Sequence, residues 1–539
     1  MMFTRDSKRA EMCTIIGAHL VMAPVSFGWM YGNFSPYLNS YFRNHCYPKC
    51  LDGDSQWILN LYLGFLGVGL LVFDFLKRYV GLKWTYILSI VLYNGPFFLS
   101  AWTVQESVIA TCVLLGLFGG FAAGVSMNVG FSYINLWNPK NIAVYVVTVT
   151  AIAPTLGVVQ NQCVGAFVNP RNLKPNAEYG PMVLFSQPEI LDKVPKVIFL
   201  LGGLTLALQL IGLVLVSSST SSSPTQSTPQ TSKLNTPSRL HSVLLEDESF
   251  CGGNKCKVND ASRLLDKETS DTNSNAVKLY NSNGSSIRQK SDFFSSDDKT
   301  TPGTATTEDL SCSQPFNSET LNSDLDQNCE ALASETELKQ RQYKPSEAVR
   351  TPKFWTFWLY AVSISLGMEL NYSYYKQFGL LYIPNDQLLT ALGSFIPVVV
   401  CASRFLFAFL VQSGILNFMN GLIISLPLNC ITCAFWYFAP AYSEVVYIVL
   451  ILVMAFSHSF IYVVLCTGTL LEFGSEHFSS NFSVVYTGVF LTQFVAVFYL
   501  TAMLNAFGYF WVFILASFLS VLSISFMFFT EICLKERGK

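Results

Sequence analysis

The chain has 539 residues, of which 51% are hydrophobic, 14% aromatic and only 13% charged, and its formal net charge is −2. This balance excludes the basic footprint of a nucleic-acid-binding protein, so we expect no nucleic-acid partner. About a dozen apolar stretches of roughly 20 residues dominate the sequence, and a bilayer core needs about 20 helical residues to cross it. The sequence therefore predicts an integral membrane protein surrounded by lipid.

The apolar stretches form two groups of six. The first group falls near residues 12–33, 56–76, 84–103, 107–134, 142–166 and 195–216. The second group falls near residues 353–380, 388–411, 415–438, 444–468, 481–504 and 508–530. We predict an all-α integral membrane fold of twelve transmembrane helices, with an N-terminal six-helix bundle at 1–216 and a C-terminal six-helix bundle at 353–530.

The segment between the two groups, residues 217–352, is rich in Ser, Thr, Asn and Asp and has few large apolar residues. Such a composition predicts a disordered cytosolic linker, either a plain tether or a phosphorylated regulatory segment. Lys and Arg in the short flanks gather on the side of both termini, which indicates the cytosol. We expect cytosolic termini, a cytosolic tail at 531–539 and residence in the plasma membrane.

Motifs of catalysis and cofactor binding are missing from the sequence. It contains no nucleotide-binding glycine loop, no metal-ligand cluster and no nucleophile elbow. We therefore expect no enzymatic activity, no catalytic residues, no cofactor and no metal. Any transport would be driven by gradients rather than by ATP.

Glycines recur along the fourth predicted span. The sequence GLFGGFAAG places Gly116, Gly120 and Gly124 four residues apart, which gives a helix a smooth face for close packing. We expect this face to contact the second span, which carries its own glycines at Gly64, Gly67 and Gly69.

Ionisable residues inside the spans are the candidates for function, because a charge in hydrocarbon is costly and usually faces a wet cavity. Arg404 is the strongest candidate, since it lies deep in the apolar run IPVVVCASRFLFAFL. Its planar guanidinium can bind a carboxylate through two parallel hydrogen bonds. The alternatives are that Arg404 reaches the cytosolic interface or pairs with an acidic neighbour.

The seventh predicted span carries three further candidates. Helical spacing places Tyr372 and Lys376 on one face, with Glu369 two turns from Lys376. We expect Tyr372 to contact the substrate. A buried Glu369 is a candidate for proton coupling, and the alternative is an ion pair with Lys376 or Arg404.

Three polar residues in other spans complete the list of candidates. His19 in the first span and His458 in the tenth are of the type that titrates near neutral pH. We interpret His19 as a second candidate for proton coupling, and His458 and Asn128 as substrate contacts. For each of them the alternative is an ordinary structural hydrogen bond.

Two six-span halves joined by a long loop resemble the major facilitator superfamily. The stretch GLLVFDFLKRYVGLK is similar to the superfamily's signature between spans 2 and 3, although residues are inserted. The resemblance implies a gating loop that holds the neighbouring half, formed here by Asp74, Arg78 and Lys83. A simple positive-inside anchor is the alternative for the two basic residues.

Within that superfamily the chain resembles the oxalate:formate antiporter and monocarboxylate porter branch. The segments that carry this resemblance are SPYLNSYF, WNPKN, FVNPRNLKPN, NYSYYKQFGL and LLEFGSEHFSSNFS. It implies that Arg404 matches the arginine of span 8 that binds the carboxylate. The lysine of span 11 that helps to hold oxalate has no counterpart in SVVYTGVFLTQFVAVFYL, which favours a singly charged solute.

The sequence thus predicts a secondary transporter that moves a small organic anion, above all a monocarboxylate, by rocking of two halves around a central site. Protons or a counter-anion are the expected coupling partners. One alternative is a carrier of the same fold for neutral solutes such as amino acids or sugars. Another is a membrane sensor that does not transport and uses the long loop to recruit partners.

Overall fold

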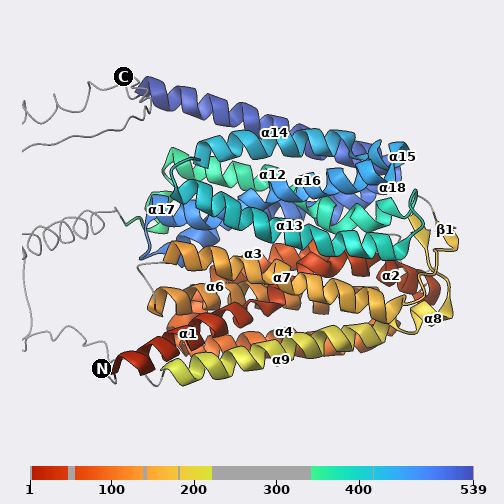
Figure 1. Ribbon diagram of the computed structural model, residues 1–539, viewed down its shortest axis with the longest axis horizontal. Coiled ribbons are helices and arrows are strands. Elements are labelled where there is room, and N and C mark those ends of the chain that lie inside the picture. Colours follow the sequence, from red (N-terminus) through yellow and green to blue (C-terminus); the bar gives the residue numbers. More distant parts are fainter. Residues whose placement is uncertain are drawn as a thin grey trace, which may run out of the picture. The chain divides into compact units, whose positions relative to one another are not determined.

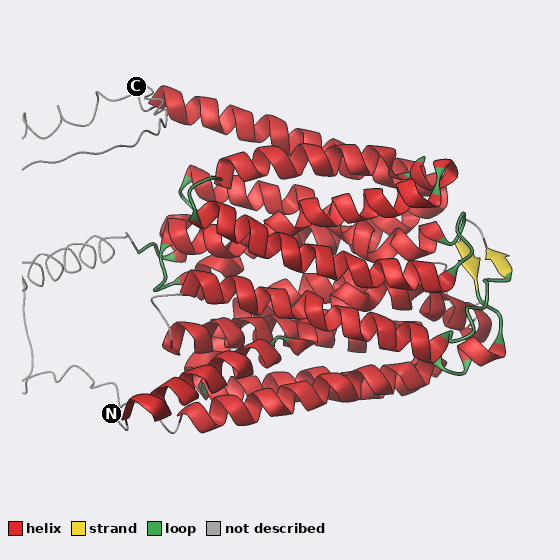
Figure 2. Ribbon diagram, viewed as in Figure 1, coloured by secondary structure: helices red, strands yellow, loops and turns green. Residues whose placement is uncertain are grey.

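The computed structural model describes residues 3–46, 55–137, 142–179, 182–220, 342–416 and 418–537. Within these ranges the chain is almost entirely helical, and its one sheet is a short antiparallel hairpin of β1 (Ala177–Tyr179) and β2 (Met182–Leu184) (Figure 2). Most of the expected linker, residues 221–341, lies outside the described residues.

Residues 3–220 are called the N-terminal half below. Its helical segments are α1 (Phe3–Val21), the 3₁₀ turn η1 (Ala23–Ser26), α2 (Phe27–Cys46), α3 (Ser55–Val80), α4 (Leu82–Glu106), α5 (Val108–Thr111), the π-helical η2 (Cys112–Phe118), α6 (Gly119–Trp137), α7 (Ile142–Val168), α8 (Pro188–Leu191) and α9 (Val194–Thr220).

Residues 342–537 are called the C-terminal half. Its helical segments are α11 (Pro345–Ala348), α12 (Pro352–Gly379), α13 (Asp386–Gln412), α14 (Phe418–Trp436), α15 (Ala439–Tyr442), α16 (Glu444–Tyr462), the π-helical η4 (Val463–Gly468), α17 (Thr469–Phe473) and α18 (Phe478–Arg537). The short α11 falls within the range 217–352 in which the sequence predicts a linker.

Twelve helical passes can be traced through these segments. Eight helices are long and apolar enough to cross a bilayer, and a ninth pass is the bent pair Arg9–Val21 and Ala23–His45, whose axes differ by 41°. The more polar α12, the shorter α14 and a second pass within α18 complete the set. The 60 residues of α18 would span about 90 Å as one straight helix, but Gly508, with φ of 77°, divides it into two arms. The predicted all-α fold of twelve transmembrane helices is confirmed.

Several helices extend beyond the predicted spans. The first pass continues past residue 33 to Cys46, so the stretch SPYLNSYF is helical rather than part of a loop. Similarly, α3 continues to Val80, which places Asp74 and Arg78 in a helix and reduces the turn to Gly81, with φ of 82°. Hydropathy marks the part of a helix that lies in hydrocarbon, whereas the hydrogen-bonded helix continues into the interface.

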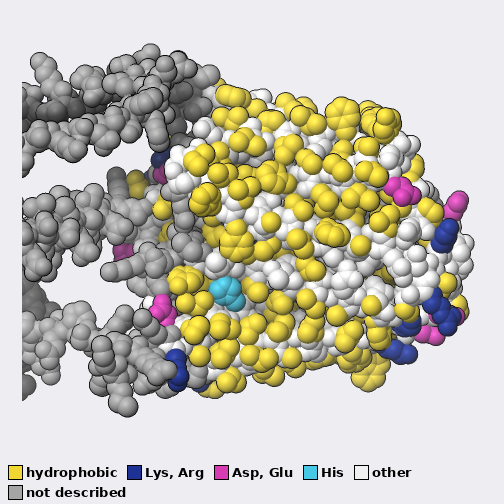
Figure 3. All heavy atoms as spheres, viewed as in Figure 1, with side chains coloured by type: hydrophobic (Ala, Val, Ile, Leu, Met, Phe, Trp, Pro, Cys, Tyr) yellow, Lys and Arg dark blue, Asp and Glu magenta, His cyan; other side chains and the backbone are white. Residues whose placement is uncertain are grey.

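Both termini lie at one end of the helices, and the β1–β2 hairpin lies at the other (Figure 1). These are called the terminal end and the hairpin end. Apolar side chains cover the flank between them, and charged side chains gather toward the two ends (Figure 3). Large apolar residues such as Trp102 and Ile109 are more than 70% exposed. A surface of this kind fits lipid rather than water.

The two halves meet along three helix pairs, in which α2 packs against α12, α3 against the first arm of α18, and α7 against α13. In each pair the N-terminal half contributes one helix and the C-terminal half the other. The residues between these pairs therefore lie where the two halves can move against each other.

The predicted close packing between the second and fourth spans is confirmed for the face of α6 and for Gly69, but not for Gly64 and Gly67. A Cβ atom added to Gly120 or Gly124 of α6 would lie 2.1 or 2.0 Å from a backbone carbonyl oxygen of α3. Gly69 of α3 approaches the backbone of α6 as closely. Gly64 and Gly67 instead face Phe490 of α18, so one face of α3 packs within its own half and another packs across the interface.

We expect Gly120→Ala to destabilise the fold by about 1 to 3 kcal/mol, because the new methyl group would meet the carbonyl oxygen of Tyr62 and the helices would have to separate. Thermal unfolding of purified protein, followed by size-exclusion chromatography, measures this. Gly203→Ala in α9 is the matched control, because no atom lies within 4 Å of its added Cβ. Equal stability of the two variants would contradict the close-packing account.

Candidate functional site

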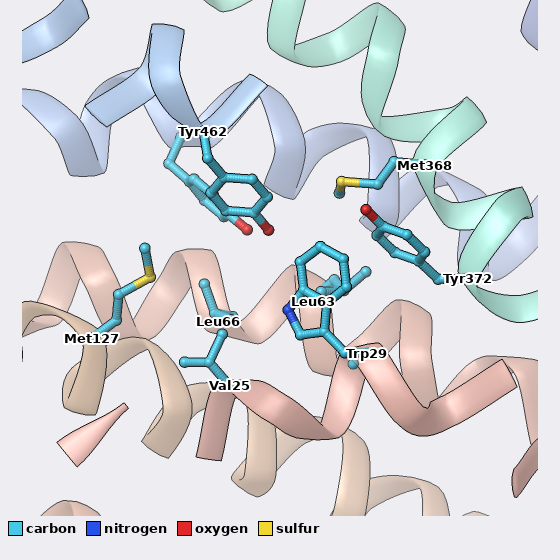
Figure 4. Close-up of a pocket in the computed structure, with 10 residues that line it drawn as sticks. Val25, Trp29, Leu63, Leu66, Met127, Met368, Tyr372 and Tyr462 are labelled. Atoms are coloured by element: carbon cyan, nitrogen blue, oxygen red, sulfur yellow. The ribbon is translucent and has the colours of Figure 1, made fainter. Parts of the chain in front are cut away.

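A small cavity lies between the two halves. The N-terminal half contributes Val25, Gly28, Trp29, Leu63, Leu66 and Met127, and the C-terminal half contributes Met368, Tyr372, Tyr462 and Tyr486. Figure 4 shows the rings of Trp29, Tyr372 and Tyr462 converging from opposite sides. The cavity has a volume of about 20 Å³, which holds about one water molecule. Any larger ligand requires these rings to move apart.

Arg404 of α13 lies behind two of these rings. Its side chain is 1% exposed. The guanidinium carbon lies 3.9 Å from the ring centre of Tyr462 and 5.2 Å from that of Trp29. Nη1 donates a hydrogen bond to the carbonyl oxygen of Thr150 in α7, whereas Nε and Nη2 are buried without a hydrogen-bond partner. Arg404 thus belongs to the C-terminal half and contacts the N-terminal half, and the Nε–Nη2 edge of its guanidinium makes no hydrogen bond.

The charge of Arg404 is not compensated by a carboxylate in the part of the chain that is described. The ion pairs there are Arg171–Glu189, Lys353–Glu472, Lys376–Asp386 and a longer His477–Glu476 contact. An unpaired charge in the membrane interior costs several kcal/mol, and stacking on aromatic rings returns only about 1 to 2 kcal/mol per contact. The arrangement leaves a buried cation that an anion would stabilise.

Tyr372 of α12 borders the same cavity. Its ring centre lies 4.6 Å from that of Trp29, and its hydroxyl group is buried without a hydrogen-bond partner. His458 of α16 stands on the far side of Tyr372, with the ring centres 6.2 Å apart. Its Nε2 pairs with Oδ1 of Asn429 at 2.7 Å. The structure therefore brings Tyr372 to the cavity wall and places Arg404 and His458 behind the rings that line it.

Asn128 and His19 are engaged elsewhere. The Asn128 amide donates to the carbonyl oxygen of Leu70 at 2.9 Å and to the hydroxyl of Ser483 at 3.1 Å, which links α6 and α3 to α18. His19 of α1 contacts the carbonyl of Ile15 and, through Nε2, the hydroxyl of Thr148 in α7 at 3.1 Å. Neither side chain lines the cavity.

Glu369 of α12 is fully buried, one turn from Tyr372 toward the terminal end. Oε1 accepts a hydrogen bond from Ser373 at 2.7 Å, and Oε2 has no partner. No ion pair of the described residues includes Glu369. The alternative that Glu369 pairs with Lys376 or Arg404 is therefore wrong in this conformation.

Lys376 pairs instead with Asp386, the first residue of α13, at 2.7 Å, with both side chains at most 1% exposed. Sequence reasoning missed Asp386, because it precedes the apolar run of its span and follows Asn385, which caps the helix by accepting from the Leu388 amide. The sequence contains a signal for this residue, an acidic side chain in the first turn of a membrane helix, but one helix alone does not show which neighbour it faces.

The residues of the predicted gating loop lie at the terminal end. Asp74 is half-buried and accepts a hydrogen bond from the hydroxyl of Ser480 in α18, so it contacts the other half. Arg78 and Lys83 are exposed. The structure thus joins the acidic member of this group to the C-terminal half and leaves its basic members at the surface.

No sequence-family profile and no curated protein sequence matches this chain. Solved structures do match along nearly its whole length. The partially occluded, inward-open xylose transporter XylE from E. coli gives a TM-score of 0.55 at 11% identity and covers 97% of this chain and 98% of its own. A D-xylose-proton symporter gives 0.56 at 11% identity and covers 96% of each chain. The chain has the fold of the major facilitator superfamily.

The inward-open XylE structure also aligns, with a TM-score of 0.52 at 12% identity over 96% of this chain and 94% of that one. In this chain, the major facilitator fold places the cavity and Arg404 between the two halves. Identities of 11 to 12% support the fold alone, so the chemistry of the site must come from its own residues.

We expect Asp386→Asn to destabilise the protein by about 3 to 5 kcal/mol, because it leaves the Lys376 charge buried without its counter-ion. Adding Lys376→Met should recover most of that loss, since it removes the uncompensated charge. Thermal unfolding in detergent of the wild type, the two single variants and the double variant measures the coupling. Additive losses in the double variant would contradict a buried ion pair.

Proposed function

We propose that this protein is a secondary transporter that moves small organic anions, and monocarboxylates above all, by alternating access. The observation that carries the proposal is the edge of the Arg404 guanidinium formed by Nε and Nη2, which is buried and has no partner. This edge can hold both oxygens of a carboxylate through parallel charge-assisted hydrogen bonds. Arg404 would anchor the substrate, and the free hydroxyl of Tyr372 would add a neutral contact.

Charge balance favours a substrate with one negative charge. Lys376, the other buried membrane cation of the described residues, is already neutralised by Asp386. The first arm of α18 contributes no Lys or Arg. A monocarboxylate would therefore neutralise the site, whereas a dicarboxylate would bring an uncompensated charge into a low-dielectric interior.

A neutral solute fits these residues less well. A sugar or amide would leave Arg404 uncompensated, and the cavity wall offers mostly apolar and aromatic groups to its hydroxyls. The structural neighbours that handle xylose have the same fold, but their solute is a property of those proteins. A sensor that does not transport would depend on residues 217–352, and no observation on the described residues favours it.

The position of Arg404 also fits alternating access. It lies on α13 but donates to the backbone of α7 in the other half, so a rocking motion changes its surroundings. The cavity of about 20 Å³ between the rings is too small for an organic anion, so the rings would have to move apart to admit one. We further propose that both termini face the cytosol and that the protein resides in the plasma membrane.

We propose that Glu369 carries the coupling proton. Its Oε2 is buried without a partner, and no counter-ion lies within ion-pair distance in the described structure. The titratable side chains that interact with it electrostatically are Tyr31 of α2, Tyr374 of α12 and Tyr499 of α18. An ionised Glu369 would balance the charge of Arg404 in the empty carrier. When an anion binds and compensates Arg404, a proton would neutralise the Glu369 carboxylate. His19 joins α1 to α7 and takes no part in this proposal.

Uptake of labelled monocarboxylates into proteoliposomes tests the role of Arg404. We expect Arg404→Ala to reduce saturable uptake at least about 100-fold and Arg404→Lys about tenfold, because two charge-assisted hydrogen bonds are worth roughly 3 kcal/mol or more together. Arg171→Ala, which removes an exposed arginine paired with Glu189, is the matched control. Full carboxylate uptake by Arg404→Ala would remove Arg404 from the site.

Glu369→Gln separates proton coupling from anion binding. We expect the variant to keep exchange of one monocarboxylate for another, because Arg404 is intact, and to lose accumulation driven by an imposed proton gradient. Counterflow and gradient-driven uptake in the same proteoliposomes measure the two activities. Undiminished gradient-driven accumulation by Glu369→Gln would eliminate Glu369 as the proton carrier and leave the anion site unaffected.

A further inference from the structure

The two halves are joined by different kinds of contact at their two ends. At the hairpin end, a buried network includes an ion pair. It consists of Asn33, Tyr37 and Asn169 from the N-terminal half and Lys376, Asp386 and Thr390 from the C-terminal half. This network is called the polar clasp below. Its place at the hairpin end is clear from the contact of Tyr37 with Phe185, the residue that follows β2, at 5.3 Å between ring centres.

Four hydrogen bonds of the polar clasp across the interface have Lys376 or Asp386 as one partner, and a fifth joins the neutral side chains of Thr390 and Asn33. Asp386 Oδ2 accepts from the Tyr37 hydroxyl at 2.5 Å and from the Asn169 amide at 2.9 Å. Lys376 Nζ donates to Asn33 Oδ1 at 2.7 Å and to the Tyr37 hydroxyl at 3.1 Å. Hydrogen bonds to charged groups are roughly twice as strong as those between neutral groups.

The ion pair itself does not cross the interface. Lys376 lies in the last turn of α12 and Asp386 begins α13, and both residues belong to the C-terminal half. Separation of the halves at the hairpin end would therefore remove only the neutral partners Asn33, Tyr37 and Asn169, and each charge would keep its counter-ion. The polar clasp can therefore open without leaving a charge uncompensated. In the closed state, charge-assisted hydrogen bonds hold the two halves together.

Among the described residues, the two halves are joined more weakly at the terminal end. The hydroxyl of Ser483 donates to the carbonyl oxygen of Leu70 at 3.0 Å and accepts from the amide of Asn128 at 3.1 Å. A charged contact at this end is the hydrogen bond that the Ser480 hydroxyl donates to Asp74. The Asp74 side chain is half-buried, so water can reach it. A polar contact exposed to water gains less than a buried one, because water competes for its partners.

We propose that the polar clasp is the dominant gate of the solute-free protein, which keeps the hairpin end closed and lets the terminal end open more readily. This inference rests on the alternating-access part of the proposed function but not on the identity of the solute. Tyr37 lies at the centre of this gate. Its hydroxyl donates to Asp386 and accepts from Lys376, and the centre of its ring lies 4.4 Å from Lys376 Nζ.

Solvent access at the hairpin end tests the proposal without any solute. Ser394 of α13 is 6% exposed and accepts a hydrogen bond from Gln162 of α7, in the other half, at 2.7 Å. Ser394→Cys, placed in nanodiscs, would be labelled with a hydrophilic maleimide when the hairpin end opens. The same protein without this substitution gives the background from native cysteines.

In the Ser394→Cys protein, we expect Tyr37→Phe to accelerate labelling about tenfold or more, because the loss of charge-assisted hydrogen bonds raises the open population by a similar factor. Asn169→Ala is the second variant and should act in the same direction. Ser483→Ala is the matched control, since it deletes a hydroxyl from the terminal-end contact and should leave labelling unchanged or slower.

Two results would overturn the proposal. One is a labelling rate that neither Tyr37→Phe nor Asn169→Ala changes in protein that remains monodisperse. The other is equal acceleration by Ser483→Ala, which would show that the two ends do not differ. Either result would leave the anion-binding role of Arg404 intact, because no carboxylate is present in the experiment.

Discussion

One buried cation that has no counter-ion among the described residues is the constraint on which the rest of this structure depends. Arg404 lies in the interior of a membrane helix, stacks on Tyr462 and Trp29, and uses one nitrogen to hold the backbone of the opposite half. Its remaining edge has no partner. Stacking and one hydrogen bond lower the cost of this charge without cancelling it, so the site gains most from an anion that arrives from solution.

The helix α13 contains both ways of placing a charge in a membrane interior. At its first residue, Asp386 is fully compensated by Lys376. Eighteen positions later in the sequence, Arg404 is left without a carboxylate. The compensated pair can serve as a fixed structural element of the C-terminal half, whereas the uncompensated cation remains available for a ligand. One helix would then carry both the proposed gate and the proposed substrate anchor.

The sequence predicted the features that depend on one helix at a time. Apolar runs gave the twelve passes, the depth of Arg404 followed from the run around it, and the glycine spacing of α6 gave its close contact with α3. Apart from this glycine contact, the pairings of polar side chains between two helices were missed. Lys376 pairs with Asp386 rather than with Glu369 on its own helix, because α12 and α13 are adjacent in space at the hairpin end. The partners of Asn128 were missed for the same reason, because its amide donates to Leu70 of α3 and to Ser483 of α18.

A ligand-bound structure with a bromine-substituted monocarboxylate, located by its anomalous signal, tests the central claim most directly. The account predicts one bound molecule between the halves, with both carboxylate oxygens within hydrogen-bond distance of Nε and Nη2 of Arg404. It also predicts that the rings of Trp29 and Tyr462 move apart to admit it. A carboxylate bound elsewhere between the halves, with the free edge of Arg404 still unoccupied, would contradict the account.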